Sequence, residues 1–78
     1  MSKMHIDECV RATLEGYLRD LGGTEPDGMY TMLVNVVEKP LLEVVMHHAD
    51  NNQSKAAQWL GLNRNTLRKK LLEHKLIN

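Results

Sequence analysis

The chain has 78 residues, a formal net charge of zero and one cysteine, Cys9, so we expect one small domain, residues 1–78, without an internal disulfide bond. No apolar run reaches the roughly 18 residues that a membrane span needs. The acidic first residues also lack the apolar core of a signal sequence, and a single cysteine fits the reducing cytoplasm, so a cytoplasmic protein is expected. The zero charge hides an asymmetry, because residues 1–50 carry four Lys or Arg and nine Asp or Glu, whereas residues 51–78 carry six and one. This division predicts a basic contact surface on an acidic body.

Two long amphipathic helices are predicted in the first two thirds of the chain. Apolar residues recur at steps of three and four over residues 6–21, and Gly22-Gly23 then ends the helix. A second stripe covers residues 29–49, with Pro40 in its middle. Proline either kinks a helix or divides it in two. We favour one kinked helix, because the apolar period continues past Pro40.

The last third, Asn52–Leu76, predicts a helix-turn-helix. A short helix, Gln53–Leu60, is followed by a turn at Gly61-Leu62-Asn63 and by a second helix from Arg64 to about His74. Small residues in the first helix allow the two helices to cross closely, and leucines supply the contacts between them. The predicted caps are Asn52 or Asp50 for the first helix and Asn63 for the second.

The second of these helices carries a polar, cationic face, and its N-terminal end is the end that usually enters a major groove. An arginine there, Arg64, suits the O6 and N7 acceptors of guanine. The chain offers no paired carboxylates, nucleophile–base set or phosphate loop, so we expect neither an enzyme nor a cofactor. The adjacent His47 and His48 point about 100° apart on a helix, which makes a poor chelating pair, so no metal site is expected.

The stretch from Lys39 to Leu71 resembles the C-terminal half of the Fis (factor for inversion stimulation) family of bacterial nucleoid-associated proteins. The motifs PLLEVVM, NQSKAA and LGLNRNTLRKKL carry the resemblance, which extends more loosely over Cys9–Asn78. It implies an all-α fold of four helices, in which a two-helix dimerisation region, residues 6–49, precedes the helix-turn-helix, residues 52–76. Two amphipathic helices also exceed what a small helix-turn-helix can cover, so an intertwined homodimer is expected.

The resemblance further implies a transcriptional regulator of the nucleoid that binds double-stranded DNA with its recognition helices in adjacent major grooves. In this family those helices lie closer together than one turn of straight DNA, so bound DNA is expected to bend. RNA polymerase is a candidate protein partner. Longer family members carry an N-terminal β-hairpin arm that touches a recombinase. This sequence begins almost at its first helix, so recombinase stimulation is not expected.

The DNA contacts implied by the family fall on eight positions, which divide by role. Base edges are contacted by Asn63 and Arg64, the DNA backbone by Thr66, Arg68, Lys69 and Lys70, and phosphates at the start of the third helix by Asn52 and Ser54.

Two other functions remain open. The LGLNRNTLRKKL element is shared with the C-terminal domains of NtrC-type activators, so the chain could be the DNA-binding and dimerisation module of such an activator. Alternatively, it could be a helical adaptor that binds protein with its basic face. A steep salt dependence of binding to duplex DNA separates DNA binding from the adaptor.

Overall fold

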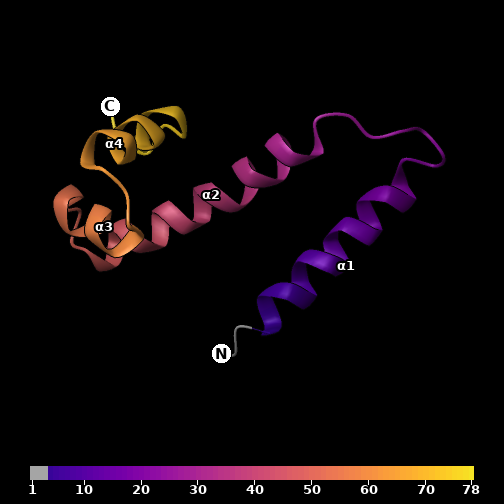
Figure 1. Cartoon of the computed structure of the whole chain (residues 1–78), viewed down its shortest axis with the longest axis horizontal. Coiled ribbons are helices and arrows are strands. Elements are labelled where there is room, and N and C mark those ends of the chain that lie inside the picture. The colour runs from indigo at the N-terminus through magenta and orange to yellow at the C-terminus, as the bar shows by residue number, and fades with distance from the viewer. Residues whose placement is uncertain (1–3) are drawn as a thin grey trace.

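The computed structural model describes residues 4–78. Four helices follow one another, and no strand occurs in this part of the chain (Figure 1). They are α1 (Met4–Asp20), α2 (Met29–His48), α3 (Gln53–Leu60) and α4 (Arg64–Glu73). The all-α prediction is confirmed. Predicted helix boundaries differ from these by one or two residues, which is the ordinary uncertainty of helix ends.

The protomer is elongated, because its two long helices diverge. Figure 1 shows α1 and α2 as the arms of an open V joined by a loop, with α3 and α4 gathered at the far end of α2. The radius of gyration is 15.1 Å, whereas a compact chain of this length is expected near 11–12 Å. Helix α1 therefore lies apart from the packed end of the molecule.

The hydrophobic core lies entirely at the end of the molecule that holds α3 and α4. Its buried side chains are Leu42, Met46, Ala49, Ala56, Ala57, Leu67 and Leu71. Among the residues that the structure describes, none before Leu42 is buried. The C-terminal half of α2 thus belongs to the same packed unit as the two short helices, while α1 and the first half of α2 share no buried core.

Helix α2 continues through Pro40, as the apolar period predicts. A proline ring displaces the carbonyl group four residues earlier, here that of Val36, and leaves it without its helical partner. Val36 and Pro40 are both exposed. Water can therefore hydrate the free carbonyl group, and the helix continues without a buried polar defect.

The chain turns in the same way after each of α2, α3 and α4. Beyond each helix a residue adopts a left-handed conformation, namely Asp50 after α2, Gly61 after α3 and Lys75 after α4. The following residue then donates its N–H to a carbonyl oxygen five residues back, at 2.8 to 2.9 Å. This arrangement satisfies carbonyl groups at the helix end and turns the chain sharply. The turns fold α3 and α4 back against α2.

None of the helices in residues 4–78 combines the length and the apolar character that crossing a lipid bilayer requires.

Candidate nucleic-acid interface

Small side chains on α3 pack against leucine side chains on α4. Ala56 and Ala57 of α3 and Leu67 and Leu71 of α4 are all buried. An alanine side chain lets a neighbouring helix approach closely, and the leucines fill the remaining space. The opposite faces of both helices are left at the surface, which is the arrangement that a helix-turn-helix requires.

The start of α4 presents hydrogen-bond donors to solvent. Asn63 is extended, and its Oδ1 accepts the backbone N–H of Asn65 at 2.7 Å, so it caps the helix as predicted. This bond uses the carbonyl oxygen of the Asn63 side chain and leaves its amide group free to donate outward. Arg64 follows at the surface. Unpaired N–H groups, the positive end of the helix and an arginine together make this end attractive to anions.

The start of α3 repeats this pattern. Asn52, rather than Asp50, is its cap, because Asn52 Oδ1 accepts the backbone N–H of Lys55 at 3.1 Å. Ser54 is exposed in the first turn. The Lys55 Nζ atom lies 5.3 Å from the ring centroid of Trp59, which is itself exposed. Two helix N-termini of the same packed unit therefore offer donors and a cation.

The outer face of α4 carries cations that are free to contact a partner. Thr66, Arg68 and Lys69 are exposed, on turns of the helix facing away from its buried leucines. In the described part of the chain, no carboxylate lies within ion-pair distance of Arg64, Arg68 or Lys69. This face can therefore approach a polyanion without first breaking an internal ion pair.

Lys70 is placed differently from the other seven predicted contact residues. Its Nζ atom lies 2.9 Å from Oε2 of Glu38 on α2. The other oxygen of this carboxylate, Oε1, lies 2.8 Å from Nε2 of His74, the residue that ends α4. An ionised carboxylate can only accept, so the proton of this second hydrogen bond resides on His74 Nε2. The structure thus gathers seven predicted residues at the surface and ties the eighth to α2.

Hydrogen bonds favour the charged forms of Glu38 and Lys70. Those from Lys70 and, next, His74 lower the pKa of Glu38 below its ordinary 4.5, against the opposing effect of partial burial. The hydrogen bond with Glu38 raises the pKa of Lys70 above its ordinary 10.5. Sequence reasoning missed Glu38, although one signal was present. It is a carboxylate four residues before the buried Leu42 and eight before Met46, and so lies on the core-facing stripe of α2.

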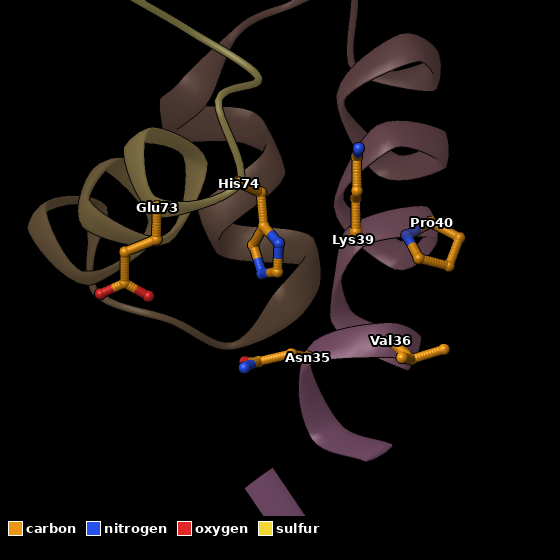
Figure 2. A pocket seen from close by; sticks show the side chains of 6 residues that line it. All are labelled: Asn35, Val36, Lys39, Pro40, Glu73 and His74. Carbon is orange, nitrogen blue, oxygen red and sulfur yellow. The ribbon is translucent and has the colours of Figure 1, made fainter. Parts of the chain in front are cut away.

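A cleft of about 400 Å³ lies beside this cluster, between α2 and the end of α4. Figure 2 shows the His74 side chain lying between α4 and α2. The lining side chains are Asn35, Val36, Lys39, Pro40, Glu73 and His74. Within residues 4–78 no group of three or more His, Cys, Asp or Glu side chains could hold a metal ion.

The sequence profile of a family described as "Bacterial regulatory protein, Fis family" matches residues 34–74, which include every element of this surface. A Fis-like DNA-binding protein of Ralstonia nicotianae is 53% identical over 77 residues, covering 99% of this chain and 100% of the relative. A protein of the same description from Neisseria meningitidis serogroup A is 58% identical over 72 residues, covering 92% and 91%. The DNA-binding protein Fis of Aliivibrio fischeri is 45% identical over 69 residues, covering 88% of this chain and 70% of the relative.

Proposed function

The chain belongs to the Fis family of bacterial regulatory proteins, and on that premise we propose that it binds and bends duplex DNA as a homodimer. In this role it acts as a nucleoid-associated transcriptional regulator in the bacterial cytoplasm, and not as an enzyme. Residues 6–49 serve dimerisation and residues 52–76 serve DNA binding. RNA polymerase remains a candidate partner on the strength of the family resemblance.

The observation that carries this proposal is the surface formed by the N-termini of α3 and α4 and by the outer face of α4. Seven exposed residues make up this DNA-binding surface, namely Asn52, Ser54, Asn63, Arg64, Thr66, Arg68 and Lys69. Their donors and cations match what DNA offers, since phosphates and guanine edges are acceptors. The cations near this surface balance an acidic remainder, so the chain is attracted to DNA at one end only.

Within this surface the residues divide by chemistry. Arg64 and the free amide group of Asn63 stand at the helix end that enters a major groove, where base edges are within reach. Arg68 and Lys69 lie further along α4 and are suited to the phosphates that border the groove. Ser54 and the capped N-terminus of α3 are suited to phosphates of the same or a neighbouring strand.

Dimerisation is supported by apolar surface that the protomer leaves uncovered. Val34, Val37 and Leu41 lie on one side of α2, where Val37 is 46% exposed and Leu41 47% exposed. An apolar groove of about 290 Å³ runs along this side, and another of about 280 Å³ lies between α1 and α2. Surfaces of this kind are costly in water. A second copy of the chain would cover both grooves and supply the N-terminal half with a shared core.

Bending follows from the expected spacing of the two α4 helices. Successive major grooves on one side of straight DNA are about 34 Å apart. A Fis-like dimer holds its recognition helices closer than this, so DNA must curve toward the protein and its central minor groove must narrow. The deformation costs about 1–6 kcal/mol, and less in flexible or A·T-rich sequence. Preference is therefore expected at central base pairs that no side chain touches.

A titration with duplex DNA of random and of Fis-type degenerate sequence tests binding, and its salt dependence tests the mechanism. If Lys55, Arg68 and Lys69 of both protomers neutralise about six phosphates, the log–log salt slope is expected near −5. A slope shallower than about −2 would overturn DNA binding in favour of a protein-binding adaptor. Circular-permutation mobility tests bending separately, because a bound fragment that runs as straight DNA would remove only that part of the proposal.

A further inference from the structure

We propose that Glu38 is a positioning residue for DNA binding, which locks the recognition helix α4 to the dimerisation helix α2 and withholds Lys70 from the DNA. By fixing α4 on α2, Glu38 sets the separation of the two recognition helices in the dimer. This inference rests on the proposed function, because a separation has meaning only for a dimer bound to DNA.

We call the contact of Glu38 with Lys70 and His74 the clamp, because it holds the end of α4 at two points. Glu38 lies 32 residues from Lys70 and 36 from His74 in the sequence, yet each of its carboxylate oxygens has its own partner, at 2.9 and 2.8 Å. The two partners are four residues apart, so α4 is held at two successive turns. The Glu38 side chain is only 15% exposed. Apolar contacts between the helices are non-directional, whereas these charge-assisted hydrogen bonds fix both distance and rotation.

The position of Glu38 connects the clamp to the proposed dimer contact. Glu38 lines the same groove as Leu33, Val34, Val37 and Leu41, the uncovered apolar face of α2. One residue therefore borders the surface where the second copy is expected and also holds the helix expected to enter the DNA. A small rotation of α4 at this point would move its N-terminal end relative to the two-fold axis, and would do so in both protomers at once.

The same contact changes what Lys70 contributes to binding. A cation that is already paired with a carboxylate at 2.9 Å neutralises that charge and releases no counterion when DNA binds. Lys69 precedes it directly and is exposed, and no carboxylate that the structure describes lies within ion-pair distance of it. The pair Lys69 and Lys70 is thus an internal comparison between a DNA-facing cation and a structural one.

The first experiment measures salt slopes of DNA binding for Lys69→Gln and Lys70→Gln in the full chain. Lys69→Gln is expected to make the slope shallower by about 2 per dimer, since two phosphate contacts are lost. Lys70→Gln is expected to leave the slope unchanged. Equal losses in the two variants would overturn the assignment of Lys70. A wild-type slope near zero would instead refute DNA binding itself.

The second experiment measures spacing discrimination, using duplexes whose two half-sites are moved apart or together by one base pair. We expect the wild-type dimer to discriminate by about tenfold, the effect of one unfavourable base pair. Glu38→Gln should reduce this preference at least threefold while binding to the best spacing persists. Far-UV circular dichroism checks that the variant remains helical.

A charge-exchanged double variant, Glu38→Lys with Lys70→Glu, makes the test independent of folding defects. It re-forms an ion pair across α2 and α4, so it should restore spacing discrimination, even though position 70 now carries a negative charge. If Lys70 contacted a phosphate, a glutamate at position 70 would weaken DNA binding instead. Discrimination that survives Glu38→Gln, or that is not restored in the double variant, would overturn the proposal and leave DNA binding intact.

Discussion

Arg64 and Lys69 lie five residues apart on α4, and the proposed binding mode places them differently relative to the DNA major groove. Arg64 is the first residue of the helix, beside the capping Asn63, whereas Lys69 projects from its outer face. Arg64→Ala is expected to cost about 1–3 kcal/mol at a preferred site and to flatten the preference among sequences. Lys69→Ala should weaken all sequences about equally. Competition titrations against a panel of duplexes measure both, and parallel losses in the two variants would contradict the assignment of Arg64 to base readout.

The Glu38 cluster also predicts how stability depends on pH. The pKa of Glu38 is lowered by folding, so its contribution is present above pH 4.5 and is lost as pH falls through the lower folded pKa. The pKa of Lys70 is raised, so its contribution is present below pH 10.5 and is lost as pH rises through the higher folded pKa. Lys70 is one-third exposed, and solvent screening limits the pair to about 1 kcal/mol.

Urea unfolding of the wild type and of Glu38→Gln, each at one fixed protein concentration, measures this contribution. The difference in unfolding free energy should be constant near neutral pH and should shrink as pH is lowered below 4.5. A difference that grows on acidification would contradict the sign of the pKa shift.

At the scale of whole elements, local rules predicted the helices and their beginnings well. The sequence predicts Asn63 as a cap because the side-chain oxygen of Asn can accept a free N–H group at a helix start. It predicts a turn at Gly61, whose conformation in the structure is left-handed, because a Gly-containing turn joins the two helices of a helix-turn-helix. Local rules did not predict the left-handed conformations of Asp50 and Lys75. At both positions the next residue donates a hydrogen bond to a carbonyl oxygen five residues back, and this bond stabilises the turn.

No local rule predicts the contact between Glu38 and α4. Its partners are separated by more than 30 residues of sequence, and helical periodicity shows only which residues share a face of one helix. For Lys70 the family pattern therefore implied a DNA contact, whereas the structure shows an internal ion pair. The seven other predicted residues needed only local order to reach the surface, and they are all exposed.

The ends of α3 and α4 offer a matched pair of stability tests. Gly61→Ala should lower the unfolding free energy by about 1 kcal/mol, because alanine resists a left-handed conformation, although within the described part of the chain the added Cβ would have no neighbour within 4 Å. Lys75→Gly should raise it by up to about 1 kcal/mol for the converse reason. Lys75→Ala is the control for charge, and a gain equal to that of Lys75→Gly would show that the backbone is not the cause.

At the scale of the whole molecule, the distribution of the core predicts that the chain needs a second copy. Val37 lines both apolar grooves, and in a dimer Val37→Asp would place an unpaired carboxylate in an apolar contact, at a cost of several kcal/mol. We expect this variant to lose the dimer and tight DNA binding. Thr31→Asp, at an exposed position near the start of α2, is the control, since an acid there suits the helix dipole. Sedimentation equilibrium measures both, and a well-folded monomeric wild type at micromolar concentration would refute this interface.

Among the residues that the structure describes, the buried side chains all lie between Leu42 and Leu71, and this has a consequence for the lifetime of the protein in a cell. If the chain forms the proposed dimer, a chain that loses its partner would keep a folded C-terminal end but would expose residues 4–41 as helices without a core, and such segments open readily. Proteases cleave open segments first. We therefore expect limited proteolysis of increasingly dilute protein to cut within residues 4–41 and to spare residues 42–77. Bound DNA should protect the whole chain. The half-life of each chain would then depend on the cellular concentration of the protein. At low concentration fewer chains would meet a second copy, so more of them would be degraded.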